Sequence, residues 1–341
     1  MNRQTQVTHS TTRPPLRLVK TIGMSREAWL DVRRTGIGSS DAAAAVGVSP
    51  YQSPLELWMV KTGRTERLEQ PDSDDDTSPV YWGHLLEPIV ARAYERRSGN
   101  KVRRVNAVLQ HPNPDYPWML ANIDREVIGQ PEVQILECKT TGAFAAKLWD
   151  HGVPEHVQVQ VQHQLAVTGK AAADVAVLIA GQTLRIHRIE RDEGLITDLI
   201  QLEKHFWRFV ETDTPPPADG SDSSDRALHA LFPHDHGESQ DWRDDTTWSA
   251  RFDDLLALRQ QRQALEAQEQ ALMQTIKQAM GDATTAAFTQ GKISWKRSQD
   301  SQVLDTARLK KEHPDLMAQY QTTREGSRRF LISTKTQEIP S

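Results

Sequence analysis

The residues best suited to do chemistry in this chain are Glu137 and Lys139, which interrupt the apolar run "ILECKTTG" at residues 135–142. Residues two positions apart on a β-strand point to the same face of a sheet, so the carboxylate and the ammonium group reach one cavity while Leu136 and Cys138 face the other way. A Glu-x-Lys triplet is expected by chance about once in a chain of this length. Alone, the pair is better explained as the solvated face of an ordinary strand.

Other acidic and amide residues strengthen the case. Asp124 ends the run "WMLANID", from which a short turn can bring its carboxylate beside Glu137; Glu87 lies in the preceding predicted helix and Gln160 in the following one. Three carboxylates without cysteine or paired histidine ligands predict a hard-oxygen site that suits Mg²⁺ or Mn²⁺ rather than zinc. Such a cation offsets charge on phosphoryl oxygens and supplies a water for in-line attack. The set therefore predicts phosphodiester hydrolysis, with Lys139 orienting the water or helping to deprotonate it.

The elements that must position these residues follow from periodicity, capping residues and turn residues. Helices are predicted over residues 25–36, 38–47, 53–63, 82–99, 154–169 and 192–210. Pro88 requires the fourth of these helices to begin or kink there. Strand-like runs at 102–109, 118–128 and 133–139 look like a meander, and two more strands cover 173–181 and 182–190. This order predicts an α/β core with a mixed central sheet flanked by helices.

Composition divides the chain into regions. Residues 1–20 are predicted to be a disordered lead-in, and 21–212 the catalytic domain. Prolines and small polar residues predict a linker over 213–235. Residues 236–341 are predicted to be a C-terminal extension with a small α+β module, used for assembly or partner binding. Its long helix, Trp248 to Met280, has a partial coiled-coil seam and is followed by a strand, a helix and a strand at "SRRFLIS" (327–333).

The overall composition excludes several classes of protein. Among 341 residues there is a single cysteine, Cys138, which rules out an internal disulfide framework and a multi-cysteine zinc site and is predicted to be a core thiol. No apolar run approaches the roughly 20 residues that cross a bilayer, so we expect no membrane association and a cytoplasmic protein. The net charge of −5 does not indicate nucleic-acid binding, but it does not exclude a local basic surface.

Several motifs in a fixed order now carry a resemblance. They are "RRTGIGSSDAAAAVGVSPYQSPLELWMVKTG", "WGHLLEP", "ANIDREV", "LECKTT" and "QVQVQHQLAVTG". Over about residues 25–210 the chain resembles the YqaJ-like viral recombinase family, relatives of the lambda exonuclease within the PD-(D/E)XK nuclease fold, which is restriction-endonuclease-like. Five ordered motifs are far more specific than any single one.

The resemblance implies roles for the residues already singled out. Lys139 matches the catalytic lysine, and Gln160 matches a helix glutamine that supports the active site. The implied ligands of the metal are Asp124, Glu137, the backbone carbonyl of Cys138 and, as a helix acid near the metal, Glu87. One departure is Arg125, at a position where a glycine commonly follows the aspartate, and it puts the loop geometry in doubt.

The resemblance also implies an activity. Such enzymes degrade one strand of linear double-stranded DNA from a 5′ end and leave a 3′ single strand for a phage single-strand annealing protein, and relatives form ring-shaped trimers. In lambda-type relatives an arginine and a serine hold the terminal 5′-phosphate, and Arg33 and Ser40 match them here. Two alternatives stay open, a structure-specific endonuclease of the same fold and a non-catalytic DNA-binding or assembly subunit; the intact acids and lysine argue against the second.

Simpler explanations exist for several of these residues. Arg33 fits the wet side of an amphipathic helix, Ser40 fits a helix cap, and Glu87 and Gln160 fit exposed helix positions. The segment "ARAYERRSGNKVRR" is either a solvated face or a track for the DNA backbone. The residues proposed for that track are Arg96, Arg97, Arg103 and Arg104. His234 and His236 resemble a metal pair but are predicted to lie in a loop.

Overall fold

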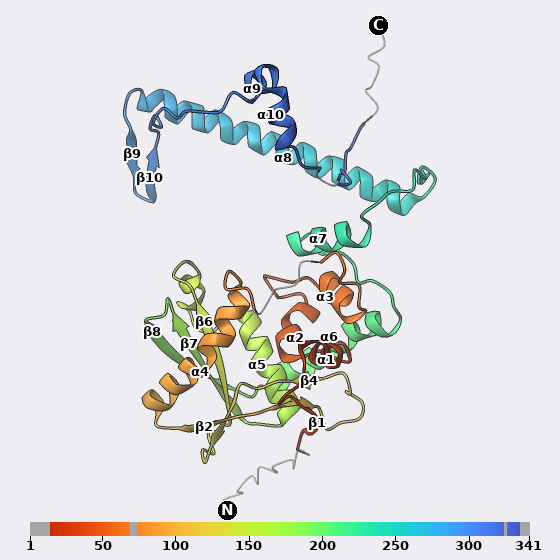
Figure 1. The fold of residues 1–341 in the computed structure, drawn as a ribbon, viewed down its shortest axis with the longest axis vertical. Helices are drawn as coiled ribbons and strands as arrows, with labels where there is room; N and C mark the ends of the chain where they lie inside the picture. The colour runs from red at the N-terminus through yellow and green to blue at the C-terminus, as the bar shows by residue number, and fades with distance from the viewer. Residues whose placement is uncertain (1–13, 69–73, 324–325, 335–341) are drawn as a thin grey trace, which may run out of the picture. The chain divides into compact units, whose positions relative to one another are not determined.

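The computed structural model describes residues 14–68, 74–323 and 326–334 (Figure 1). The chain divides into two compact units, Met1–Pro233 and His234–Ser341, here called the N-terminal and C-terminal units. Every predicted site residue lies in the N-terminal unit. Within the described residues, no helix is long and apolar enough to cross a membrane.

A five-stranded mixed sheet forms the centre of the N-terminal unit (Figure 1). Its order is β2 (Lys101–Arg104), β5 (Arg125–Ile128), β6 (Ile135–Thr141), β7 (Ala172–Ile179) and β8 (Thr183–Glu190). Strands β6 and β7 are parallel and all other pairs are antiparallel. The chain crosses from β6 to β7 through the 3-10 helix η1 (Phe144–Trp149) and the helix α5 (Glu155–Thr168). The predicted α/β fold with a mixed sheet is confirmed.

Helices cover both faces of this sheet. On one face, α4 (Pro79–Ser98) packs Val90, Ala91 and Tyr94 against Leu136 of β6. It begins at Pro79 and continues through Pro88. On the other face lies a larger core built around α5. The remaining helices of this unit before residue 215 are α1 (Arg26–Arg34), α2 (Ser39–Ala45), α3 (Pro54–Lys61) and α6 (Glu193–Glu211).

The predicted three-strand meander is confirmed in part. Strands β2, β5 and β6, one from each predicted run, are antiparallel neighbours in that order, but two of the runs are each divided between two sheets. The run at 102–109 breaks into β2 and β3 (Ala107–Gln110), and the run at 118–128 breaks into β4 (Leu120–Ala121) and β5. A second sheet has the order β1 (Leu16–Lys20), β3, β4. Apolar residues lie on both sides of each break, so local composition does not show where the chain changes sheets. The break after β4 places Asp124 in a bend rather than within a strand.

The predicted disordered lead-in also needs correction. Residues 16–20 form β1, which pairs with β3 in antiparallel register. Three of its five residues are apolar, but so short a run next to two prolines did not indicate a strand until its pairing with β3 was seen. Residues 1–13 of the lead-in lie outside the described residues.

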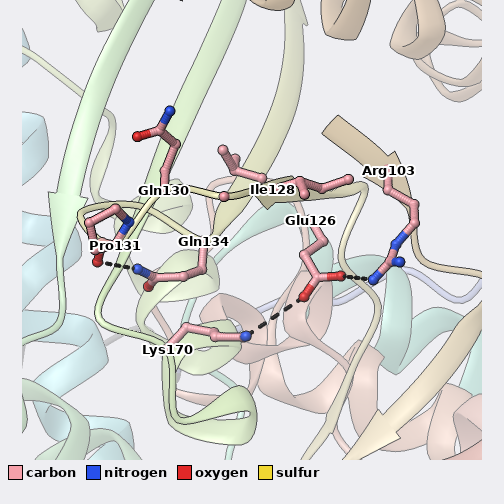
Figure 2. Close-up of a pocket in the computed structure, with 9 residues that line it drawn as sticks. Arg103, Glu126, Ile128, Gln130, Pro131, Gln134 and Lys170 are labelled. Atoms are coloured by element: carbon pink, nitrogen blue, oxygen red, sulfur yellow. Dashed lines mark hydrogen bonds and ion pairs between the residues drawn. The ribbon is translucent and has the colours of Figure 1, made fainter. Parts of the chain in front are cut away.

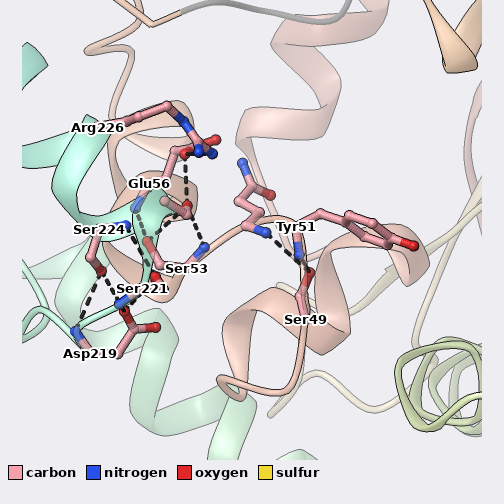
Figure 3. A network of polar contacts seen from close by, with 10 residues as sticks. Ser49, Tyr51, Ser53, Glu56, Asp219, Ser221, Ser224 and Arg226 are labelled. Atoms are coloured by element: carbon pink, nitrogen blue, oxygen red, sulfur yellow. Dashed lines mark hydrogen bonds and ion pairs between the residues drawn. The ribbon is translucent and has the colours of Figure 1, made fainter. Parts of the chain in front are cut away.

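The predicted linker contains a helix, α7 (Asp222–Leu231), which packs on α3. The Ser223 hydroxyl accepts a hydrogen bond from Ser53 N at 2.8 Å and donates one to Glu56 at 2.7 Å. Arg226 also binds Glu56, at 3.1 Å (Figure 3). These partners lie about 170 positions apart in sequence, so local composition alone predicted a flexible segment. Helix α7 is therefore part of the N-terminal unit.

The C-terminal unit contains the long helix α8 (Thr246–Met280) and a hairpin of β9 (Thr285–Phe288) and β10 (Gly291–Ser294). Two short helices follow, α9 (Thr306–Glu312) and α10 (Pro314–Gln319). The predicted strand at 327–333 is wrong: these described residues form no strand, since β9 and β10 pair only with each other. Seam residues Leu258, Leu265 and Leu272 of α8 are exposed.

Candidate active site

Strand β6 presents Glu137 and Lys139 on one face, as their spacing predicts. Glu137 is buried at 3 % exposure, and Lys139 Nζ lies 2.8 Å from its Oε1. Leu136 and Cys138 pack on the opposite face, against the core beneath α4. Burial alone would lower the pKa of Lys139, but the nearby Glu137 and Asp124 carboxylates raise it above its usual value.

Two glutamines one turn apart on α5 each donate a hydrogen bond to the Glu137 carboxylate. Gln160 Nε2 donates to Glu137 Oε1 at 2.6 Å, and Gln160 Oε1 accepts from Lys139 Nζ at 2.8 Å. Gln164 Nε2 donates to Glu137 Oε2 at 2.7 Å and to the Asn122 carbonyl at 3.2 Å. The predicted Gln160 is therefore in the site, and sequence reasoning missed Gln164. Its position four residues after Gln160, on the same face of the helix, was the available signal.

Asp124 reaches the same place from the bend before β5. Its Oδ2 accepts a hydrogen bond from Cys138 N at 2.8 Å, which brings the carboxylate beside β6. Burial raises the pKa of Asp124 well above its usual value, and the charges of Glu137 and Glu87 raise it further. Burial and the same carboxylates raise the pKa of the Cys138 thiol, as expected for a core thiol.

Glu87, on α4, lies near Asp124, but its carboxylate already has an ion-pair partner. The buried Arg125 guanidinium pairs with Glu87 and donates to the Asp124 carbonyl at 2.7 Å. Thus the arginine at the position expected to be glycine neutralises the helix acid. Within the described part of the chain, no three His, Cys, Asp or Glu side chains form a group that could hold one metal ion. The expected convergence of three carboxylates is therefore corrected to two, Asp124 and Glu137, of which Glu137 also pairs with Lys139.

The remaining pair still fits a hard divalent cation. Asp124 and Glu137 are oxygen donors, and a cation beside them would offset both the burial and the neighbouring carboxylates that raise the pKa of Asp124. Magnesium keeps several waters and is commonly held by one or two protein carboxylates. The donor set therefore suits magnesium or manganese better than a metal that needs a closed protein cage.

A second charged cluster lies between α1, α2 and α3. Arg33 donates to the Ser40 hydroxyl at 2.9 Å and pairs with the buried Asp41. Lys61, also buried, binds Asp41 at 2.6 Å and the Arg33 carbonyl at 2.7 Å. Burial would raise the pKa of Asp41, but Arg33, Lys61 and a hydrogen bond from Gly38 N hold it well below its usual value. Sequence reasoning named Arg33 and Ser40 and missed Asp41 and Lys61.

The predicted basic track is exposed and lies at the end of α4 and along β2. Arg96, Arg97, Arg103 and Arg104 all face solvent. A hollow of about 490 Å³ opens beside β2 and the turn after β5 (Figure 2). There Glu126 pairs with Arg103 at 2.6 Å and with Lys170 at 3.7 Å, so the cations are partly neutralised. None of the catalytic candidates lines this hollow. His234 and His236 lie in an irregular segment, as predicted.

Comparison with known proteins identifies the family of this chain. A family model described as the YqaJ-like viral recombinase domain matches residues 28–171. The chain is 38% identical over 304 residues to the uncharacterized protein YqaJ of Bacillus subtilis (strain 168), covering 88% of this chain and 92% of that protein. Two crystal structures of LHK-Exo, an alkaline exonuclease from Laribacter hongkongensis, also match, one of them in complex with dAMP. They are 21% and 23% identical with TM-scores of 0.44 and 0.45, over 55% of this chain and 93% of theirs.

Proposed function

The chain belongs to the YqaJ-like viral recombinase family, and from this membership and the site we propose that it is a magnesium-dependent 5′-to-3′ exonuclease. It would digest one strand of linear double-stranded DNA and leave a 3′ single strand for recombination by annealing. The observation that carries this proposal is the hydrogen-bonded set of Glu137, Lys139 and Gln160 with Asp124 beside it.

Each residue of the set has a task in phosphodiester hydrolysis. Asp124 and Glu137 would hold Mg²⁺ or Mn²⁺, with the Cys138 carbonyl as a further ligand; when bound, the cation offsets phosphoryl charge and activates water. Lys139 would orient the attacking water toward the phosphorus atom. Gln160 accepts a hydrogen bond from the Lys139 ammonium group and donates one to an oxygen of Glu137. It therefore fixes the position of these two side chains relative to each other. Such preorganisation favours in-line attack because the donors need not reorient.

Recognition of the 5′ end would fall to the cluster around Arg33. The Arg33 and Lys61 cations face the single Asp41 anion, leaving one positive charge in excess. An exposed hydroxyl, Ser40, lies beside the guanidinium. A terminal phosphate carries more negative charge than an internal phosphodiester, and a guanidinium binds it with paired hydrogen bonds. This cluster is therefore suited to select a phosphorylated end.

Digestion of an end-labelled linear duplex tests the proposal directly. With Mg²⁺, label at the 5′ end should be released before label at the 3′ end, and faster when the 5′ end carries a phosphate. Ca²⁺ in place of Mg²⁺ should permit DNA binding but suppress turnover, because the larger ion accepts looser coordination. Cleavage of a covalently closed circle would indicate the endonuclease alternative. DNA binding without any cleavage would indicate a non-catalytic subunit.

The C-terminal unit is proposed to serve assembly or partner binding. The exposed leucines on α8 suit packing against another helix, either of a second copy in a ring-shaped trimer or of a single-strand annealing protein. Replacing Leu258, Leu265 and Leu272 together by glutamine should lower the mass measured by sedimentation if copies associate through this helix. An unchanged mass would leave the annealing protein as the proposed partner.

A further inference from the structure

An exposed aromatic side chain lies near the candidate active site and has no task in the chemistry described so far. Tyr51 belongs to the loop between α2 and α3 and is 66 % exposed. Its ring packs edge-to-face on His156, with centroids 5.5 Å apart and planes at 89°. His156 lies in the first turn of α5. The pair thus joins a loop to the helix that carries the active-site glutamines.

Helical spacing places this pair next to the catalytic set. His156 precedes Gln160 by four residues, so the two side chains lie on one face of α5, a turn apart. Gln160 in turn binds Lys139 and Glu137. Partial burial, and then the charge of Lys139, lower the pKa of His156, which agrees with this proximity. Tyr51 therefore packs on the helix face that carries Gln160, whose side chain binds Lys139.

The loop that carries Tyr51 is held in place. The Ser49 hydroxyl accepts hydrogen bonds from the backbone N–H groups of Tyr51 and Gln52, both at 3.2 Å. Two residues later, Ser53 caps α3 and is tied to α7. In Figure 3 the Tyr51 ring projects away from this polar network. An exposed aromatic ring on a fixed backbone offers contact area at a small cost in conformational entropy.

Resting on the proposed nuclease function, we propose that Tyr51, supported by the His156 ring, stacks on a nucleobase of the strand being cut, at one of the two nucleotides that flank the scissile phosphate. Bases stack on aromatic side chains without regard to sequence, as an enzyme that digests any DNA end requires. The stack would place the backbone of that nucleotide beside Lys139 and Glu137. Tyr51 is accordingly a positioning residue that acts on the substrate and not on the reacting atoms.

Paired variants and substrates test this stack. The enzymes are wild type, Tyr51→Ala, Tyr51→Phe and, as an exposed aromatic control in the C-terminal unit, Tyr320→Ala. The substrates are 5′-phosphorylated duplexes, either intact or lacking the base at one of the two flanking nucleotides. One missing base should slow wild type by about tenfold, the loss expected for one stacking contact. Tyr51→Ala should lose about as much on intact DNA and nothing further on that substrate. Tyr51→Phe and Tyr320→Ala should match wild type.

Other outcomes would overturn the proposal in distinguishable ways. If Tyr51→Ala slows intact and base-free substrates by equal factors, the ring only supports α5. If Tyr51→Phe is as slow as Tyr51→Ala, the hydroxyl and not the ring makes the contact. Should wild type fail to cleave DNA, the nuclease function falls, and the stack is then tested by binding alone. A 2-aminopurine base at the flanking positions of a duplex end, with Ca²⁺, should be quenched by wild type and not by Tyr51→Ala; equal quenching would reject the stack.

Discussion

Asp124 and Asp41 are both aspartates of the N-terminal unit with a lysine nearby, yet their surroundings shift their pKa values in opposite directions. Around Asp124, burial and the Glu137 and Glu87 carboxylates raise the pKa. Around Asp41, the Arg33 and Lys61 cations overcome burial and lower it. One cluster thus carries an excess of negative charge and the other an excess of positive charge.

Under the proposed function, the contrast would let one small unit hold both a metal cofactor and the phosphate at a DNA end. A cluster rich in carboxylates suits the cation that phosphodiester hydrolysis requires, and a cluster rich in cations suits the phosphate at a DNA end. Residue type alone does not separate the two, since each contains an aspartate and a lysine. What distinguishes the two clusters is the ratio of positive to negative charges within contact distance of each aspartate.

The largest effect is expected from removing the chemistry of the acidic cluster. Lys139→Ala and Glu137→Ala should each reduce cleavage by about a thousandfold or more while leaving DNA binding in Ca²⁺ intact, because they remove the residues proposed to orient the water and to hold the metal. Single-turnover cleavage and gel-shift binding measure the two effects. Lys147→Ala, an exposed lysine of η1, is the matched control. Full activity of either variant would contradict the assignment of these residues to the active site.

Neutralising Asp41 should lower stability, whereas neutralising Asp124 should not. In EDTA, Asp41→Asn should lower the free energy of unfolding by about 3 kcal/mol, because it leaves the buried Lys61 without its anion. Asp124→Asn should instead preserve or raise stability, because it relieves repulsion among carboxylates. Urea unfolding at pH 7 checks both. If the two variants lose equal stability, the electrostatic contrast between the clusters is wrong.

Acid titration of wild type sharpens the same point. The lowered pKa of Asp41 means that its contribution is fully present above the unfolded-state pKa of about 3.9 and is lost as the pH falls below that value. Asp41→Asn should therefore remove part of the loss of stability below pH 4. The raised pKa of Asp124 has the opposite effect on stability. As the pH falls through this raised pKa, protonation removes the cost of a buried charge beside other carboxylates, and the free energy of unfolding rises. A pH series of urea midpoints in EDTA separates these contributions.

A smaller effect is expected at the basic cluster. Arg33→Ala should slow digestion of 5′-phosphorylated ends by about tenfold or more, the loss of roughly 1.5 to 3 kcal/mol from one charged hydrogen-bonding contact. Ends with a 5′-hydroxyl should already be poor substrates and lose less. Arg34→Ala is the control, since Arg34 is exposed and pairs only with the surface residue Asp31 among the contacts observed. Equal slowing on both ends would make Arg33 a general contact to the DNA backbone.

The smallest effect should follow removal of the C-terminal unit. Both clusters lie before residue 165, so a chain that ends at Pro233 should keep the stability and the metal-dependent chemistry of the N-terminal unit. A chain that ends at Asp213 also loses α7, and the hydrogen bonds from Ser223 and the burial of Ala227 go with it, at a cost of about 1 to 3 kcal/mol. Thermal unfolding of the two truncated chains tests the difference. A folded but inactive chain ending at Pro233 would show that the chemistry needs residues 234–341.

Local periodicity was enough to place several elements and one part of the site. The two-residue spacing of Glu137 and Lys139 required a shared face once residues 135–141 formed a strand, and the structure has that face. Caps and apolar spacing predicted α1, α2, α3, α5 and α6 to within a few residues. These features depend on neighbours a few positions apart, which is the range over which a sequence pattern carries information.

Contacts between distant residues lay beyond that range. Nothing near Arg125 in sequence indicates that it neutralises Glu87, 38 positions away, and nothing near Lys61 indicates its pairing with Asp41. The division of two strand-like runs between two sheets likewise depended on which partner strands were present.

The sequence by itself determined which side chains share a strand face or a helix face, because the repeats of β-strand and α-helix are set by backbone geometry. It therefore specified Glu137 with Lys139, and Gln160 with Gln164. Tertiary structure alone decided how many charges of each sign surround each aspartate, because those charges arrive from separate elements. Coulomb interactions depend on distance in space, so the acidic character of one cluster and the basic character of the other arise only when α1, α2, α3, α4 and β6 have packed.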